Sequence, residues 1–299
     1  MPENAIVVED LRKSYGDVVA LDGVSFEIKQ GEVVSILGPN GAGKTTTVEI
    51  LEGYLKGWSG KVDVLGDDPL QGGVKHRERI GIVLQESGVE PYMTVTEILE
   101  QRSRWYREPL DIKNVIEEVG LTEKSDALIK TLSGGQRRRL DVALAVVGNP
   151  ELIFLDEPTT GFDPSARRHS WELVKALSKS GKTILLTTHY MDEAQALSDR
   201  VIVMAKGQIV AEGSPSEIGG RQESDATVTF TLSDLTHLDK APVKYEISGN
   251  KVSFKSSDSV RDLHALTGWA LDHKIDLAGL EVKRPTLEDV YIHLTEGGK

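Results

Sequence analysis

The chain contains no cysteine among its 299 residues, and this absence removes two classes of structure. Neither a disulfide framework nor a thiolate metal site can form, so a reducing cytoplasm is compatible with the sequence. A basic excess is also missing, because the net charge is -12 and the isoelectric point is about 5.1. This acidic balance argues against a protein that grips a nucleic-acid backbone, and it disfavours direct adhesion to an anionic membrane surface.

Long hydrophobic runs are absent as well. The strongest apolar stretches are "VALAVV" at 142–147 and "ELIFL" at 151–155, which are far shorter than the ~20 residues of a membrane-spanning helix. The N-terminus "MPENAIVVED" lacks a basic segment followed by an apolar run, so we expect no secretory signal. Any membrane role must then come through a partner chain. With 39% hydrophobic residues, the sequence can still bury a core, in one large domain and a small one.

Apolar runs and helical periodicity alternate along the first two thirds of the chain. Buried strands that alternate with helices predict an α/β domain with a parallel sheet over residues 1–215, with a helical subdomain inserted at about 92–145. A hairpin-like "RVIVMAKGQIVAEGS" closes this part near residue 214. The clearest expected strands are 5–11, 24–28, 31–38, 151–156 and 183–188, and the clearest expected helices are 94–106, 112–120 and 165–181.

The last third of the chain has a different pattern. Residues 216–225 read as a linker, and residues 226–299 predict a small α+β domain. Its features are the strand "ATVTFTL", a hairpin with a Gly249-Asn250 turn and the helical "SVRDLHALTGWALDHK". The end of the chain, "PTLEDVYIHL", opens with Pro285 and a capping box from Thr286 to Asp289.

The most specific motif is "GPNGAGKTT" at 38–46, which has the spacing G-x-x-x-x-G-K-[ST] directly after the apolar strand "VVSIL". Glycine lets such a loop turn tightly and aim its backbone N–H groups at phosphate oxygens. Lys44 would reach the β- and γ-phosphates, and the Thr45 hydroxyl would ligate Mg²⁺. The plain alternative is a glycine-rich turn before a helix. We expect ATP to contact Gly38, Pro39, Asn40, Gly41, Ala42, Gly43, Lys44, Thr45 and Thr46.

A second motif, "ELIFLDEPTTGFD", ends an apolar strand in two acids. Asp156 would lie at the carboxyl edge of the sheet, where open α/β folds bind ligands, and could hold Mg²⁺. Glu157 could orient or deprotonate an attacking water. Alone, two acids after a strand also suit a capped turn. Beside the phosphate loop they are the second half of a nucleotide site.

The stretch "TLSGGQRRRLDVALA" places Ser133, Gly134 and Gly135 at the start of a helical pattern. Free N–H groups and the helix dipole favour an anion there, although Ser133 could equally cap its own helix. The run "RRR" at 137–139 suggests nucleic acid at first sight. Successive helical residues point about 100° apart, so we expect a solvated or interdomain face instead.

Taken in order, these motifs resemble those of ATP-binding-cassette (ABC) ATPases, the nucleotide-binding subunits of membrane transporters. The resemblance covers about residues 5–215. It includes the phosphate loop, Gln85 in "VLQE", "LSGGQ" at 132–136, "TTGFD" at 159–163 and His189 in "LLTTHY". It implies a P-loop cassette fold with a helical signature subdomain.

The resemblance also implies a dimer that hydrolyses ATP. Two subunits would pack head to tail, so that each signature loop closes on the γ-phosphate of ATP held by the other subunit. Phe162 departs from the leucine usual in the family, which leaves the packing of that interface open. The residues that would act across the interface are Ser133, Gly134, Gly135, Gln136 and Asp163.

Further roles follow from the family motifs. Tyr15 would stack on adenine, with a packed core tyrosine as the alternative. Glu157 would activate water, His189 would bind the γ-phosphate, and Gln85 would touch Mg²⁺ and the water. The expected metal ligands are therefore Thr45, Gln85 and Asp156. We assign no role to His76, His264 and His273, which show no metal-ligand pattern.

The sequence from Gly135 to Pro164 and the end "PTLEDVYIHLTEG" resemble those of bacterial multidrug exporters of the daunorubicin type. This implies a separate membrane-spanning permease subunit, a second ATPase subunit and no nucleic-acid partner. The protein would sit peripherally on the cytoplasmic face of the bacterial plasma membrane. One alternative is a soluble cassette protein that acts on ribosomes or DNA, which would typically carry two cassettes or a long coiled coil. Another is a small-molecule kinase, which would leave "LSGGQ" and His189 unexplained.

Overall fold

The protein's structure is a computed structural model that describes residues 4–83, 88–218, 226–232, 238, 241–283 and 291. The chain divides into two compact units, Met1–Pro215 and Ser216–Lys299, which are treated separately below. Within the described ranges, no helix is both long and apolar enough to cross a bilayer.

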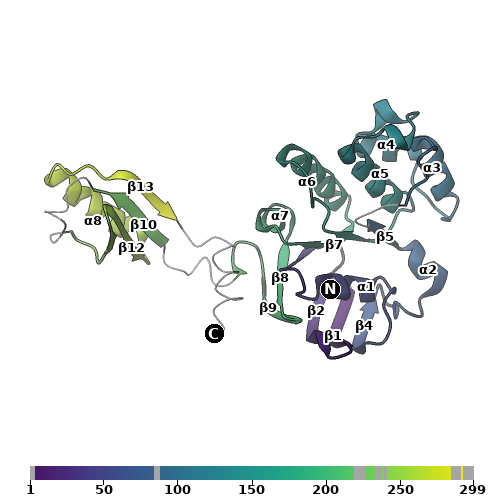
Figure 1. The fold of residues 1–299 in the computed structure, drawn as a ribbon, viewed down its shortest axis with the longest axis horizontal. Coiled ribbons are helices and arrows are strands. Elements are labelled where there is room, and N and C mark those ends of the chain that lie inside the picture. Colours follow the sequence, from purple (N-terminus) through teal and green to yellow (C-terminus); the bar gives the residue numbers. More distant parts are fainter. Residues whose placement is uncertain are drawn as a thin grey trace. The chain divides into compact units, whose positions relative to one another are not determined.

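The first unit is built around a six-stranded sheet with the order β5-β6-β7-β3-β8-β9 (Figure 1). Its first five strands are parallel, and β9 pairs antiparallel with β8. All residues of β3 and β7 are buried, as expected for central strands covered on both faces. The strands are β3 (Val33–Leu37), β5 (Ile80–Val83), β6 (Leu152–Asp156), β7 (Thr183–Thr188), β8 (Arg200–Ala205) and β9 (Gln208–Gly213).

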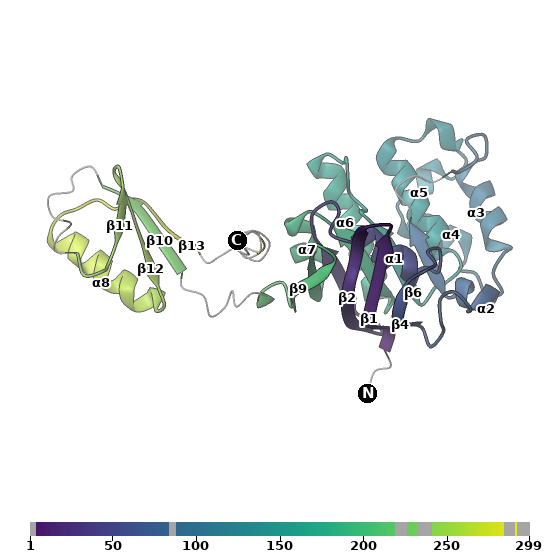
Figure 2. The same ribbon diagram turned by 60° about the horizontal axis from the view of Figure 1, so that its bottom comes forward.

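A smaller antiparallel sheet with the order β2-β1-β4 completes the strands of this unit (Figure 2). Several register shifts interrupt the pairing of β1 with β2, and another interrupts its pairing with β4. The sequence analysis missed β4, and it found only part of β2. The strands are β1 (Asn4–Tyr15), β2 (Val18–Lys29) and β4 (Ser59–Val64).

Helices cover the six-stranded sheet, and α3, α4 and α5 gather at one end of the unit (Figure 1). Each of these three begins with a side-chain cap, which is Thr94 for α3, Asp111 for α4 and Ser133 for α5. The helices of the unit are α1 (Lys44–Leu51), α2 (Gly73–Glu78), α3 (Val95–Ser103), α4 (Ile112–Glu118), α5 (Gly134–Val146), α6 (Pro164–Lys179) and α7 (Met191–Leu197), with the short 3₁₀ turns η1 (Thr122–Lys124) and η2 (Ile129–Thr131).

Two hydrophobic cores lie on the two faces of the six-stranded sheet. Alternate residues of one strand enter different cores, because successive side chains of a strand point to opposite faces. Val34 and Phe154 pack in the core formed with α1 and the antiparallel sheet, whereas Val33 and Ile153 pack in the core formed with α3, α5 and α6. The sheet is thereby fixed between two layers, and its carboxyl edge becomes a rigid platform for loops.

The second unit contains an antiparallel sheet with the order β11-β12-β10-β13 and one described helix. Val228, Phe230, Val252 and Phe254 alternate along their strands and pack against Leu266 of the helix. The expected capping box at 286–289 and most of the expected linker fall outside the described residues. The elements are β10 (Ala226–Thr231), β11 (Glu246–Ser248), β12 (Lys251–Ser256), α8 (Ser259–Asp272) and β13 (Ala278–Lys283).

The expected fold class is confirmed: the first unit is α/β with a parallel sheet, and the second is a small α+β unit. The expected helix at 94–106 ends earlier, at Ser103, and α2 was not foreseen because its six residues are too few to show a period.

Candidate functional site

The glycine loop joins β3 to α1 at the carboxyl edge of the sheet. Gly43, the residue before α1, has φ 103°, a conformation that side chains rarely adopt, and a Cβ there would come within 2.7 Å of Leu21. A Cβ on Gly38 would lie 2.6 Å from the Met204 carbonyl. No side chain caps α1. The loop therefore delivers a helix N-terminus whose first N–H groups can receive an anion.

Lys44 is folded back over this loop. Its Nζ donates hydrogen bonds to the carbonyls of Gly38 (2.9 Å) and Pro39 (3.2 Å), and the residue is only 5% exposed. The ammonium also lies 3.6 Å from Glu157 Oε1. The expected phosphate-binding lysine and the expected general base are thus brought together, although they come from different strands of the sheet.

Glu157 follows the last residue of β6 and has φ 43°, an uncommon value for a residue other than glycine. Its N–H donates to the Thr187 hydroxyl (3.0 Å), and this hydroxyl donates in turn to Asp156 Oδ1. One threonine of the neighbouring strand β7 therefore holds the backbone of Glu157 and the carboxylate of Asp156. Backbone strain of this kind persists only where the surroundings fix it.

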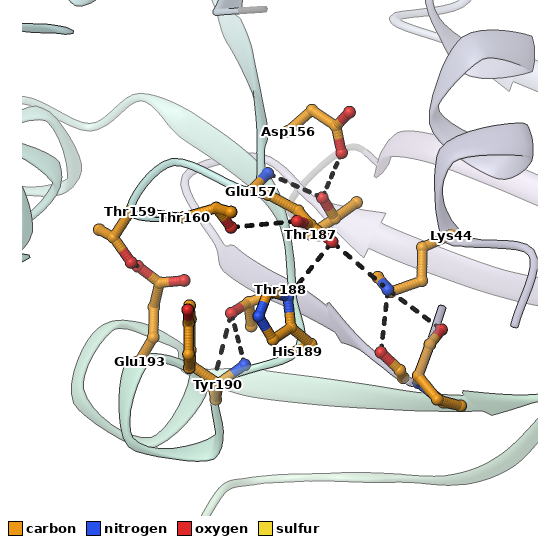
Figure 3. A network of polar contacts seen from close by, with 12 residues as sticks. Lys44, Asp156, Glu157, Thr159, Thr160, Thr187, Thr188, His189, Tyr190 and Glu193 are labelled. Carbon is orange, nitrogen blue, oxygen red and sulfur yellow. Dashed lines mark hydrogen bonds and ion pairs between the residues drawn. The ribbon is translucent and has the colours of Figure 1, made fainter. Parts of the chain in front are cut away.

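The Glu157 carboxylate is the centre of a polar cluster (Figure 3). Its Oε1 lies 3.4 Å from His189 Nδ1 and 3.6 Å from Lys44 Nζ, while its Oε2 accepts a hydrogen bond from the Thr160 hydroxyl (3.0 Å). The Glu157 side chain is 13% exposed and that of His189 is 34% exposed. The cluster is partly closed yet open enough for a reactant to enter.

Next to this cluster lies a buried acid that the sequence analysis did not identify. Glu193 of α7 is 0% exposed, and its Oε1 accepts hydrogen bonds from Thr159 (2.8 Å) and from the Trp171 indole (3.1 Å). Burial raises the pKa of Glu193, while the hydroxyls of Thr188 and Thr159 and the Trp171 indole act in the opposite direction. Glu193 thus ties the segment after Glu157, through Thr159 (Figure 3), to α6, through Trp171.

The N-terminus of α5 is closed by its own side chains. The Ser133 hydroxyl accepts a hydrogen bond from Gln136 N (3.3 Å), and Gln136 Oε1 accepts one from Ser133 N (3.0 Å). Ser133 therefore caps its own helix in the single chain, as one of the two alternatives from the sequence stated. Ser133 and Gly134 remain exposed, so this helix end faces outward.

Arg138 corrects the expectation for the "RRR" run, because it is 8% exposed rather than solvated. Its Nε donates to the Pro158 carbonyl (3.2 Å) and its Nη2 to the Asp156 carbonyl (3.4 Å). Burial lowers the pKa of Arg138, while the Asp141 and Asp156 carboxylates act in the opposite direction. Its spacing of three residues from the buried Asp141 and seven from the buried Ala145 was the available signal.

Other expected site residues lie around this centre. Tyr15 is 48% exposed with Lys13 Nζ 5.0 Å from its ring centroid, so the alternative of a packed core tyrosine is wrong. Thr45 is exposed in the first turn of α1. Asp163 Oδ1 accepts a hydrogen bond from Ala166 N (2.9 Å) in α6. Gln85 falls outside the described residues.

A groove with a volume of about 940 Å³ is lined by the segment after α1 and by parts of α2, β5, α3 and α5. Exposed apolar side chains stand along it, among them Tyr54 (68% exposed), Val74 (63%) and Trp105 (64%). Glu52 at the end of α1 is 8% exposed and also lines it. Burial raises the pKa of Glu52 to about 8, and repulsion from Asp156 and Glu49 adds to the effect.

Proteins of known name match the chain over nearly its full length. The Nod factor export ATP-binding protein I of Burkholderia orbicola (strain AU 1054) is 42% identical, with 96% of this chain and 95% of that protein covered. The daunorubicin/doxorubicin resistance ATP-binding protein DrrA of Streptomyces peucetius is 34% identical, with 98% and 93% covered. Such coverage includes the second unit as well as the first.

Family models and solved structures agree with these relatives. The model "ABC transporter" matches residues 21–160, and "ABC transporter domain-containing protein-like, C-terminal domain" matches residues 226–286. The structure of cbiO1 from Clostridium perfringens, part of the ABC transporter complex cbiONQ, is 32% identical with a TM-score of 0.66, and covers 72% of this chain and 90% of its own. A dimeric post-hydrolysis ATP-binding cassette bound to ADP and Pi is 27% identical with a TM-score of 0.61, and covers 70% and 98%. From its motifs, its fold and its relatives, the chain belongs to the ABC transporter ATPases, which bind and hydrolyse ATP.

Proposed function

We propose that the chain is the ATP-hydrolysing subunit of a bacterial exporter whose membrane-spanning permease is a separate chain. The observation that carries the proposal is the cluster in which Glu157 lies between Lys44 and His189 beside the glycine loop. Relatives named for drug resistance and Nod factor export support export as the direction of transport. The transported compound would be a drug, an antibiotic or a lipid-like molecule.

The glycine loop would hold the phosphates of ATP. The uncapped N-terminus of α1 offers backbone N–H groups, and its dipole favours a negative charge. Lys44 would exchange its two carbonyl partners for β- and γ-phosphate oxygens as the nucleotide enters. Tyr15, exposed at the end of β1, would stack on the adenine.

The oxygen atoms near the phosphates suit Mg²⁺, which prefers hydroxyl and carboxylate oxygens. Thr45 supplies a hydroxyl at the exposed start of α1, and the Thr187 hydroxyl orients the Asp156 carboxylate through Oδ1. Gln85 would join them as a third ligand. When bound, the ion would neutralise charge on the β- and γ-phosphates.

Hydrolysis would use the residues around Glu157. Glu157 would accept a proton from the water whose oxygen bonds to the γ-phosphorus, and the bond from that phosphorus to the bridging oxygen of ADP would break. Lys44 would stabilise the charge on the transferred group, and His189 would hydrogen-bond its oxygens while holding the Glu157 carboxylate in place. Thr160 fixes the other oxygen of that carboxylate.

A second copy would complete each site. The exposed α5 end, Ser133 to Gln136, would bind the γ-phosphate held by the partner subunit, and Asp163 would act across the same interface. The dimeric cassette bound to ADP and Pi supports this arrangement. ATP would close the dimer and hydrolysis would let it open.

The groove would receive the permease. Its exposed tyrosine, valine and tryptophan side chains suit an apolar segment, because large exposed apolar groups mark interaction surfaces. Val83 and Gly88, which lie on either side of Gln85 in the sequence, both line the groove, so that a bound partner could influence the site. Through this contact the protein would lie on the cytoplasmic face of the plasma membrane.

The first test is the Glu157→Gln variant. We expect turnover to fall at least about a hundredfold, with ATP binding retained and a dimer accumulating in ATP, as measured by size-exclusion chromatography with light scattering. Glu151→Gln is the matched control, because Glu151 precedes the same strand at its far end and pairs with Arg79. Unimpaired turnover of Glu157→Gln would refute its role as the base.

The second test is purification from detergent-solubilised membranes, with mass spectrometry of whatever accompanies the chain. We expect a polytopic membrane protein, and we expect Tyr54→Ser with Trp105→Ser in the groove to release it. Recovery with ribosomes alone would favour the alternative of a soluble cassette protein.

A further inference from the structure

Arg138 connects two parts of the first unit that have separate roles in the proposed function. It lies five residues after Ser133 on α5, which places it about 7.5 Å along the helix from the capped end. Its guanidinium donates to the carbonyls of Asp156 and Pro158, the residues on either side of Glu157. The helix that begins at Ser133 is therefore bonded to the turn that carries Glu157.

These two hydrogen bonds restrain the backbone on both sides of Glu157, from which its side chain projects. A residue with φ 43° is strained, and small rotations of the flanking peptide planes redirect its side chain. Arg138 bonds to the Asp156 carbonyl, which belongs to the peptide plane directly before Glu157 (3.4 Å), and to the Pro158 carbonyl, which belongs to the plane that follows Pro158 (3.2 Å). A guanidinium is planar and presents its donors in a fixed fork, so a movement of Arg138 would move both planes together.

The other contacts of Arg138 suit a link of this kind. The side chain is 9% exposed, and the Asp141 carboxylate on the next turn of α5 lies 4.0 Å from its Nη1. The Asp156 and Glu193 carboxylates also stabilise its charge, which offsets part of the cost of burial. Burial of a guanidinium costs solvation free energy. In return, Arg138 forms a stiff connection between α5 and the turn that carries Glu157.

We propose that Arg138 is a positioning residue through which occupation of the Ser133 end of α5 in one subunit aligns Glu157 of the same subunit. The proposal rests on the proposed dimer, in which the α5 end of each subunit binds the ATP of the other. Binding of one nucleotide would then prepare the base that acts on the second. The two sites would hydrolyse ATP cooperatively, and Arg138 would carry the coupling within each chain.

The first experiment measures ATPase rate against ATP concentration for the full chain. We expect a Hill coefficient approaching the limit of about 2 for two sites in the wild type and about 1 in Arg138→Met, with kcat lowered about tenfold. Arg138→Lys retains the charge but has a single donor nitrogen, and we expect an intermediate Hill coefficient for it. This variant replaces Arg138→Met in the experiment if the methionine variant folds poorly. Arg139→Met is the matched control, because Arg139 on the same helix also donates to a carbonyl, that of Gly120 (3.0 Å).

The second experiment places the substitution in one chain of a mixed dimer. One chain carries Glu157→Gln, so that only the other chain can hydrolyse ATP, and two different tags isolate the mixed species. We expect Arg138→Met to lower turnover when it shares a chain with the intact Glu157. It should have little effect when it shares a chain with Glu157→Gln.

The outcomes distinguish a failure of the role proposed for Arg138 from a failure of the proposed dimer. If Arg138 only shaped its own helix end for the partner's nucleotide, the loss would appear in the second arrangement, and the proposed link would be wrong. An unchanged Hill coefficient in Arg138→Met, with a cooperative wild type, would also overturn it. Failure to recover any mixed dimer in ATP would contradict the proposed dimer itself. The role proposed for Arg138, which depends on that dimer, would then be wrong as well.

Discussion

Helices α1 and α5 both have glycine at their start, Gly43 as the N-cap of α1 and Gly134 and Gly135 as the first residues of α5, yet their N-termini are built differently. The N-cap of α1 is Gly43, which has no side chain to offer, and the helix starts without a cap. The N-cap of α5 is Ser133, which forms a capping box with Gln136. The first helix presents its N–H groups to a ligand, whereas the second satisfies part of its own in the single chain.

This difference indicates how the proposed site is shared between two chains. An anion can bind at α1 without displacing a helix cap, and Lys44 needs only to exchange its two carbonyl partners to meet it. At α5 an anion must replace the hydrogen bonds of the capping box, so its binding free energy at this helix end is smaller in the single chain. We infer that α1 binds ATP in the isolated chain, while α5 contributes only when a second subunit brings a phosphate to it.

The largest expected effect is that of Lys44→Met, which would break the site at α1. We expect ATP affinity to fall by about a hundredfold or more, which is ~2.7 kcal/mol, because a buried ammonium is lost where phosphates bind. Isothermal titration of the isolated chain with ATP measures this. Lys61→Met, at an exposed lysine paired with Glu9, is the control that should leave the affinity unchanged. A Lys44→Met variant with wild-type affinity would place the nucleotide elsewhere.

The next effect concerns the opposite end of α1, where Glu52 is the C-cap. Its pKa rises from 4.5 to about 8 on folding, so between these values the folded chain keeps a proton that the unfolded chain releases. Stability must therefore fall as pH rises through this window and become constant above it. We expect Glu52→Gln to be more stable than wild type by about 2 to 4 kcal/mol at pH 8.5 and by little at pH 4.5.

Denaturant unfolding at several pH values, without nucleotide, tests this expectation. Glu117→Gln is the matched control, since Glu117 is exposed near the end of α4. A difference between Glu52→Gln and wild type that does not change with pH would show that Glu52 is ionised in the folded chain.

A smaller effect is expected from Ser133→Ala at α5. Loss of the cap should cost about 1 kcal/mol of stability, and turnover should fall about tenfold because a phosphate contact across the dimer is lost. ATP binding to the dilute chain should not change, in contrast to Lys44→Met. Asp111→Ala removes the cap of α4 and is expected to cost similar stability without affecting turnover. Weaker ATP binding by the Ser133→Ala monomer would erase the distinction between the two helices.

The sequence alone predicted most of the nucleotide site, for a physical reason. Phosphate chemistry demands particular residue types at fixed spacing within one short segment, so Lys44, Asp156 and Glu157 could be found before any fold was known. The central strands β3, β6 and β7 were predicted equally well, because they are continuous apolar runs, whereas the four-residue strand β5 was missed. The site roles themselves remain proposals that the variants above test.

Residues that join distant segments could not be predicted in this way. Arg138 bonds to carbonyls about twenty positions further along the chain, and Glu193 accepts hydrogen bonds from Thr159, after β6, and from Trp171 of α6. The helical spacing of Arg138 indicates only that it lies on a buried face, and Glu193 has no characteristic spacing, since the contacts of both depend on how α5, β6 and α7 pack. The strand β4 was missed for a related reason: only two of its six residues are buried, so its pattern is weak.

The smallest effect is expected from Gln136→Glu at α5. It distinguishes a phosphate-binding helix end from a merely capped one, because stability and turnover should change in opposite directions. Gln136→Glu keeps the capping box, which accepts either residue, and places a negative charge at the positive end of α5. We expect stability to rise by about 0.5 kcal/mol, while turnover falls about threefold or more because the added carboxylate repels the partner's γ-phosphate. The mirror control is Glu97→Gln in the capping box of α3, where Glu97 plays the same part beside Thr94. That substitution should lower stability slightly and leave turnover alone. If Gln136→Glu hydrolysed ATP at the wild-type rate, the N-terminus of α5 would not lie close to the partner's triphosphate. Helix α5 would then be an ordinary capped helix with no role in phosphate binding.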